Sequence, residues 1–171
     1  LYLLHWRGST ALEESLDAFR TLVEDGKIRH WGVSNFDRAD MEELVDLSSG
    51  DDVATDQVLY NLSRRGIESN VLPWCQERGV PIMAYSPIEQ GRLLGESALQ
   101  AVADRHDATP AQVALAWVLR QDHIVTVPKA GTPEHVRDNH AALQLELTEA
   151  DLDELDRAFP PPKGPQPLEM L

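Results

Sequence analysis

The sequence predicts an α/β fold, because short apolar runs alternate along it with segments whose apolar residues recur at helical spacing. Five of the apolar runs are typical of β-strands, and at least one helical segment follows each of them. Strands joined in this way pair in parallel through right-handed crossovers. Two architectures satisfy this pattern: an open doubly wound sheet and part of a (β/α)8 barrel.

The first three strand–helix units occupy the first half of the chain. Residues 1–6 are too few and too uniformly apolar for an amphipathic helix, so we expect a strand buried on both faces. The helix that follows is marked by apolar residues at helical spacing: Leu12, Leu16, Phe19 and Val23. We expect Ser9 or Thr10 to cap this helix and Gly26 to end it. The next units are strand 28–34 with helix 37–47, and strand 53–59 with helix 67–78.

The second half of the chain predicts two more strands and four helices. In order, we expect a strand at 80–85, a polar loop at 86–95, helices at 97–106 and 110–121, a strand at 124–128, helices at 133–143 and 148–159, and a Pro-rich tail at 160–171. Thr109 is in position to cap the second of these helices, with Pro110 in the favoured first helical position. Thr148 is in position to cap the last one.

The length of the chain favours a partial barrel. A complete (β/α)8 TIM barrel needs about 250 residues, and the 171 residues present leave room for five of the eight units in a single domain, 1–171. Because the chain opens on Leu1 within an apolar run, we expect its beginning to be missing. No strand is followed by a Gly-x-Gly-x-x-Gly or phosphate-loop motif, so neither nucleotide-binding motif supports the doubly wound alternative.

Charge and cysteine content exclude several classes of partner. The 29 acidic and 15 basic residues give a formal net charge of -14, which repels nucleic-acid phosphates and anionic membrane surfaces. No stretch approaches the roughly 20 apolar residues of a membrane span. The single cysteine, Cys75, cannot form an internal disulfide, so we expect a buried core residue and a reducing cytoplasm.

Polar side chains follow the apolar residues at the ends of the predicted strands: His5, Ser34 and Asn35, Asp56 and Gln57, Tyr85 and Ser86, and Lys129. Each one alone has a structural explanation, such as a helix cap, a packed core residue or a solvated cation. The carboxyl ends of parallel barrel strands converge on one face, where active sites are built around a single cavity. The recurrence of polar residues at five strand ends therefore favours a functional site on that face.

Several of these segments resemble the aldo/keto reductase family. Residues 26–36 contain a basic residue shortly before Gly-Val-Ser-Asn-Phe, which is similar to the family signature. Four further segments resemble strands of the family. Leu-Leu-His-Trp at 3–6 resembles the fourth strand and Asp-Gln-Val-Leu-Tyr-Asn at 56–61 the sixth. Ala-Tyr-Ser-Pro at 84–87 resembles the seventh strand and Val-Pro-Lys-Ala at 127–130 the eighth. The end of the chain is similar to a bacterial subgroup that reduces methylglyoxal and related short aldehydes. The resemblance implies the last five β/α units of the barrel plus a C-terminal helix and tail.

The resemblance also implies an oxidoreductase that uses NADPH, and no metal, to reduce aldehydes and ketones to alcohols by hydride transfer. His5 would orient the carbonyl of a small substrate, with Trp6 beside that substrate. The side chains that would hydrogen-bond the nicotinamide carboxamide are Ser34, Asn35 and Gln57, and Tyr85 would stack on the ring. Amide and hydroxyl groups can satisfy both the donor and the acceptor of a carboxamide, and an aromatic face packs against a planar ring.

The remaining implied contacts belong to the phosphates and the adenine. Ser86 and the backbone of the loop from Ile88 to Leu93 would approach the pyrophosphate. Lys129 would contact the adenosine 2′-phosphate, and Asn139 would contact the adenine.

Two departures from the family concern that 2′-phosphate. Members often carry Ser or Thr directly after the lysine and Arg six residues after it, where this chain has Ala130 and His135. Lys129 and His135 together therefore predict a weaker phosphate site that depends on pH, because an imidazole is only partly charged near neutrality. We expect NADPH rather than NADH as the cofactor.

A further departure is that the family's proton-donating Tyr, and the Lys and Asp that support it, precede the fourth strand. None can be assigned in this chain, so we expect the polypeptide by itself to be an inactive fragment of an enzyme whose full-length form is a monomer or a weak oligomer. One alternative is a non-catalytic half-barrel that binds a nucleotide or a partner protein. Another is an unrelated barrel with a phosphate site, for which residues 128–131 are a poor match.

Overall fold

A parallel five-stranded sheet organises the protein in a computed structural model that describes residues 1–171. Its strands, in chain order, are β1 (Tyr2–Leu4), β2 (Trp31–Ser34), β3 (Asp56–Leu59), β4 (Ile82–Tyr85) and β5 (Ile124–Thr126). Every strand pairs in parallel with the next one along the chain, so the spatial order β1-β2-β3-β4-β5 contains no reversal. A doubly wound sheet reverses its strand order at a switch point. The uninterrupted order therefore matches a segment of a barrel, and the partial-barrel prediction is confirmed.

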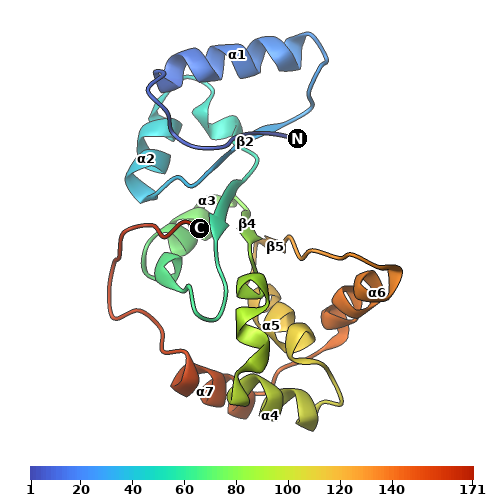
Figure 1. Cartoon of the computed structure of the whole chain (residues 1–171). Helices are drawn as coiled ribbons and strands as arrows, with labels where there is room; N and C mark the ends of the chain where they lie inside the picture. Colours follow the sequence, from blue (N-terminus) through green and yellow to red (C-terminus); the bar gives the residue numbers. More distant parts are fainter.

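Helices connect the strands of the sheet (Figure 1). The α-helices are α1 (Leu12–Glu24), α2 (Arg38–Asp46), α3 (Val71–Arg78), α4 (Ser97–Arg105), α5 (Pro110–Leu119), α6 (Pro133–Ala141) and α7 (Glu149–Ala158). Short 3-10 helices are η1 (Gly50–Asp52), η2 (Gly66–Ser69), η3 (Glu89–Gly95) and η4 (Ala142–Gln144). After α7 the C-terminal tail returns toward α3 (Figure 1), where Glu169 pairs with Arg64. No helix has the length and apolar character needed to cross a membrane.

Most predicted helix ends are confirmed by the caps. The hydroxyls of Thr109 and Thr148 each accept a hydrogen bond from the backbone three residues on, as N-cap residues do. Gly26 follows α1 with φ 68°, the left-handed conformation that ends a helix at low cost in glycine. The predicted cap of α1 by Ser9 or Thr10 is wrong, because the cap position is one residue after Thr10 and is occupied by Ala11, which makes no side-chain capping bond.

The hydrophobic core lies between the sheet and its helices. A continuous cluster of 29 buried residues includes Phe36, Met41, Tyr60 and Trp117. Cys75 is a buried member of this cluster, as predicted, and burial raises the pKa of its thiol to about 12. An unreactive thiol in this position acts as a small apolar side chain.

Three sequence predictions about the elements need correction. The first strand is not buried on both faces: β1 has only β2 as a neighbour, and Tyr2 is 53% exposed. The helix predicted at 67–78 is two elements, because the side chain of Asn70 caps α3 and separates it from η2. The loop predicted at 86–95 contains η3.

Candidate functional site

Four side chains lie close to the carboxyl ends of β2 and β4, and we call Ser34, Asn35, Gln57 and Tyr85 the strand-end cluster. The predicted place of Gln57 after its strand is wrong, because Gln57 is the second residue of β3 and reaches the cluster by pairing with Ser34 at the end of β2. Ser34 and Gln57 are register partners, as are Gln57 and Met83, so their side chains share one side of the sheet. The hydroxyl of Ser34 donates to the backbone oxygen of Gln57 at 2.7 Å, and Tyr85 donates to Asn35 Oδ1 at 3.2 Å. The structure thus brings together four residues that the sequence analysis assigned to one site.

Asn35 links the strand-end cluster to the end of β1. Its Nδ2 donates to Ser34 Oγ and to the backbone oxygen of His5, both at 3.1 Å. Its φ of 59° lies in the left-handed region, which asparagine tolerates better than most residues. Asn35 does not cap α2, because the cap is Asp37 in a reciprocal capping box with Asp40.

The rings of His5 and Trp6 lie apart from these hydrogen bonds. They stack on each other, with centroids 4.3 Å apart and an angle of 11° between planes, and both side chains are exposed. His5 reaches the cluster through its backbone oxygen alone. The structure therefore places the main chain of His5 at the site, and the role of its imidazole stays a prediction.

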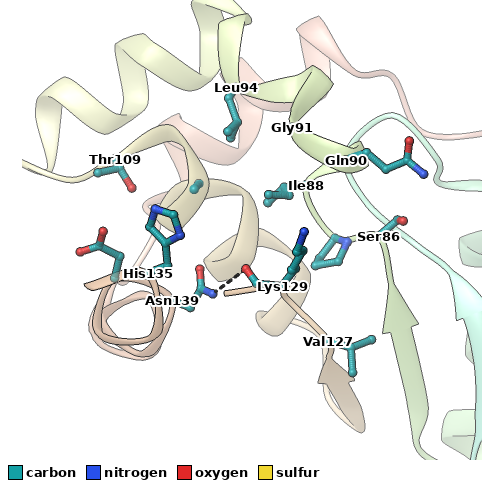
Figure 2. A pocket seen from close by; sticks show the side chains of 13 residues that line it. Ser86, Ile88, Gln90, Gly91, Leu94, Thr109, Val127, Lys129, His135 and Asn139 are labelled. Atoms are coloured by element: carbon teal, nitrogen blue, oxygen red, sulfur yellow. Dashed lines mark hydrogen bonds between the residues drawn. The ribbon is translucent and has the colours of Figure 1, made fainter. Parts of the chain in front are cut away.

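A cavity of about 640 Å³ opens beside the end of β4 (Figure 2). Its lining combines the turn after β4 with the start of α5 and the segment from β5 into α6: Ser86, Pro87, Ile88, Gln90, Gly91, Leu94, Thr109, Ala111, Val127, Lys129, His135, Asp138 and Asn139. Tyr85 and Ser86 are consecutive, so the strand-end cluster and the cavity meet at the end of β4. A volume of this size suits a cofactor or small ligand.

One wall of the cavity carries two side chains able to bear positive charge. Lys129 forms no ion pair with an acidic side chain, and its backbone oxygen accepts from Asn139 Nδ2 at 3.4 Å (Figure 2). His135 lies in the first turn of α6, where its backbone N–H donates to the cap residue Thr132 at 3.2 Å. Asp138, one turn further along α6, adds a carboxylate to the same wall. An unpaired ammonium beside an imidazole and an amide can bind an anionic group.

The opposite wall is a turn of unusual backbone shape. Ser86, Gln90 and Gly91 have φ angles of 50°, 57° and 89°, and all three line the cavity. Behind the turn, Glu89 is 4% exposed and accepts hydrogen bonds from Asn61, Arg64 and Arg92. The backbone of this wall is therefore held from outside the cavity.

Asp56, predicted to follow its strand, is instead the first residue of β3 and does not join the strand-end cluster. Because side chains alternate along a strand, it points away from the side that Gln57 faces. It is 0% exposed, and its Oδ1 accepts a hydrogen bond from the backbone N–H of Phe36 at 3.5 Å. Burial raises the pKa of Asp56 to about 8, with smaller contributions in the same direction from Asp40 and Asp37.

Sequence reasoning identified about half of the cavity lining. The predicted residues that the structure brings into it are Ser86, Ile88, Lys129, His135 and Asn139, together with Gln90 and Gly91 of the predicted loop 88–93. The lining residues without a predicted site role are Pro87, Leu94, Thr109, Ala111, Val127 and Asp138. Thr109 was predicted only as a helix cap, and nothing local distinguishes the apolar members from core residues. Their place in the cavity depends on how α5 and α6 pack.

Known proteins resemble the chain over its whole length. The model of the family described as "Aldo/keto reductase family" matches residues 1–159. The methylglyoxal reductase YeaE of Escherichia coli is 50% identical over 176 residues, covering 100% of this chain and 62% of the relative. The glyoxal reductase of Bacillus subtilis is 34% identical and is covered over 61% of its length. The chain thus spans less than two thirds of these relatives.

A solved structure supports the same relationship at the level of the fold. The aldo-keto reductase of Klebsiella pneumoniae, crystallised in complex with NADPH, superposes with a TM-score of 0.97 at 46% identity. The match covers 99% of this chain and 62% of that structure. The sequence signature, the strand order and these matches agree, and the chain belongs to the aldo/keto reductase family.

Proposed function

We propose that this chain forms the cofactor-binding part of an NADPH-dependent reductase of short aldehydes and ketones. The observation that carries the proposal is the junction of the 640 Å³ cavity with the strand-end cluster at Tyr85 and Ser86. An elongated dinucleotide with a planar ring at one end and phosphates at the other matches that arrangement. The relatives support the choice, since one is named a methylglyoxal reductase and a similar structure contains NADPH.

The residues present fit the two ends of NADPH. At the nicotinamide end, Asn35 Oδ1 accepts one hydrogen bond from Tyr85 and retains a second lone pair for a carboxamide N–H. Gln57 Nε2 donates to Met83 Sδ at 2.8 Å, a weak sulfur acceptor that a carboxamide oxygen could replace. At the phosphate end, Lys129 and His135 provide the positive charge and Asn139 an amide for the adenine.

The chain's own residues would orient the reaction. NADPH, when bound, supplies a hydride for the carbonyl carbon of the substrate. Tyr85 would hold one face of the nicotinamide, since burial keeps the pKa of its phenol above the usual value and the ring stays neutral. Ser34 and Asn35 would fix the carboxamide and so decide which hydrogen faces the substrate. His5 would orient the substrate carbonyl, with Trp6 at its side.

The proposal also covers the partner, the cellular location and the oligomeric state of the full-length enzyme. We infer a small carbonyl compound as the partner, a cytoplasmic location, and a full-length form that is a monomer or weak oligomer. A formal net charge of -14 disfavours binding to nucleic acids or anionic membranes. Asp138 beside Lys129 and His135 lowers the positive charge of the phosphate wall, so the preference for NADPH over NADH should be modest.

Fluorescence titration with NADPH tests the proposal. The chain is compared with its Lys129→Ala variant and with a chimera that adds the part of the E. coli relative that the chain does not cover. Binding by the chain and the chimera, weakened in Lys129→Ala, with methylglyoxal turnover in the chimera, supports the reductase. Tight binding without turnover in both forms favours a non-catalytic nucleotide-binding module. No binding by either form refutes the cofactor assignment.

A further inference from the structure

The turn at residues 86–91 holds a backbone shape that its own sequence does not favour. Ser86, Glu89 and Gln90 have φ angles of 50°, 49° and 57°, so three residues with a Cβ lie in the left-handed region within five positions. Left-handed backbone is unfavourable for such residues and persists only where surrounding contacts enforce it. The turn therefore needs an anchor.

The buried carboxylate of Glu89 provides this anchor without lining the cavity. Its Oε2 accepts from Asn61 Nδ2 at 2.8 Å, and its Oε1 accepts from Arg64 Nη2 at 3.1 Å and Arg92 Nη2 at 2.9 Å. Asn61 and Arg64 belong to the loop after β3. Burial alone would raise the pKa of Glu89, but these hydrogen bonds outweigh it and lower the pKa, so the carboxylate stays ionised.

Asn61 also holds the other end of the same turn. Its Nδ2 donates to the backbone oxygen of Ser86 at 2.9 Å as well as to Glu89. Asn61 is itself fixed, because it is fully buried and its Oδ1 accepts from the backbone N–H groups of Ser63 and Arg64. A single amide thus sets the separation between Ser86 and Glu89, which determines how tightly the turn curls.

We propose that Glu89, acting through Asn61 and Arg64, is a positioning residue that holds the turn 86–91 in the shape that binds the phosphates of the dinucleotide. The inference rests on the proposed function, because it concerns one wall of the same cavity. Without the carboxylate, the left-handed residues relax and fewer molecules present a competent wall, which weakens the apparent affinity. The opposite wall, with Lys129 and His135, stays as it is.

The C-terminal tail offers a way to separate the anchor from its neighbours. Arg64 Nη1 also donates to Glu169 Oε1 in the tail at 2.8 Å. Loss of this contact leaves Glu89 bonded to Asn61, Arg64 and Arg92, so the turn should keep its shape. Glu96, an exposed carboxylate at the far end of the same segment, is a matched control because it bonds none of these residues.

The test compares the wild-type chain with Glu89→Gln, Glu96→Gln and Glu169→Gln. Fluorescence titration gives the affinity for NADPH, calorimetry the affinity for adenosine 2′-monophosphate, and hydrogen exchange the protection of backbone amides 86–91. Glu89→Gln should weaken NADPH binding by about tenfold, accelerate exchange in the turn, and leave the affinity for adenosine 2′-monophosphate unchanged. The two other variants should match wild type in all three measurements.

Four outcomes would count against specific parts of this reasoning. Unchanged exchange in Glu89→Gln overturns the anchor, whether or not NADPH binds. Equal losses of affinity for NADPH and for adenosine 2′-monophosphate indicate a general structural defect and overturn the positioning role. Weakening of the same size in Glu169→Gln assigns the effect to the tail instead. If wild type binds no NADPH while Glu89→Gln still loosens the turn, the anchor stands and the proposed function fails.

Discussion

Replacing Asp56 with asparagine is expected to change how the stability of the protein depends on pH. The carboxyl group is 0% exposed, its Oδ2 has no hydrogen-bond partner, and its Oδ1 accepts one long bond of 3.5 Å from the backbone of Phe36. Burial raises the pKa of Asp56 in the folded protein to about 8. In the unfolded chain the pKa of the same carboxyl is close to its usual value of 3.8.

The direction of the effect follows from proton linkage. Between pH 3.8 and about 8 the folded state binds one proton more than the unfolded state, so rising pH favours unfolding. The stability that the neutral Asp56 carboxyl contributes is fully present below pH 3.8 and is lost once the pH has passed about 8. Within that window the free energy of unfolding falls by about 1.4 kcal/mol per pH unit. From pH 5.5 to 7.5 the loss due to Asp56 is therefore roughly 2 to 3 kcal/mol.

Urea denaturation at pH 5.5 and 7.5 measures this loss in the wild type, in Asp56→Asn and in the control Asp46→Asn, which changes an exposed carboxylate on α2. An unpaired amide N–H in Asp56→Asn adds a constant cost of about 1 to 3 kcal/mol at both pH values. The informative quantity is the free energy of unfolding of each variant minus that of the wild type. Between pH 5.5 and 7.5 this difference should shift in favour of Asp56→Asn and stay constant for the control. Parallel behaviour of Asp56→Asn and wild type would show that Asp56 is already ionised when folded.

Three further predictions concern cofactor choice and stability. His135→Arg should tighten NADPH relative to NADH by roughly 1 kcal/mol, because a permanent charge replaces an imidazole; titration with both cofactors measures it. Asp151→Asn should lower the free energy of unfolding, measured by thermal denaturation, by roughly 2 kcal/mol. The reason is that this buried carboxylate accepts a hydrogen bond from Arg105 at 2.8 Å and pairs with His106. Hydrogen bonds to Asp151 outweigh its burial and lower its pKa, so acid should destabilise wild type more than this variant. Tyr60→Phe should lower the free energy of unfolding, measured by urea denaturation, by about 1 to 2 kcal/mol, because Glu68 loses the hydrogen bond of 2.7 Å from the phenol.

The order and type of the elements could be predicted from the sequence, and their ends less well. Helix caps such as Thr109 and Thr148 depend on neighbours within one turn, so their residue types were informative. The burial of β1 was wrongly predicted, because its apolar sequence does not say how many strands it pairs with. The division of 67–78 into two helices depends on Asn70, whose capping bond was not evident from periodicity.

Some residues of the candidate site could also be predicted from the sequence, and others could not. Residues of the strand-end cluster could be predicted because each belongs to a recognisable motif, although Gln57 lies within β3 and not after it. Asp138 and Val127 were not, since only the packing of α6 and β5 brings them into the cavity. The anchor at Glu89 was missed as well, because it joins residues 25 and 28 positions apart in the chain.

The sequence by itself determined the α/β alternation, most helix caps and the family of this protein, because periodicity, capping and motifs are properties of residues close together in the chain. Only the tertiary structure decided which wall of the cavity each residue joins, how the turn 86–91 is held, and that Asp56 faces away from Gln57 into the core. Those outcomes depend on contacts between separate elements. Such contacts form only when strand pairing and helix packing bring distant residues together, and they then set the hydrogen bonds and solvation on which the proposed site depends.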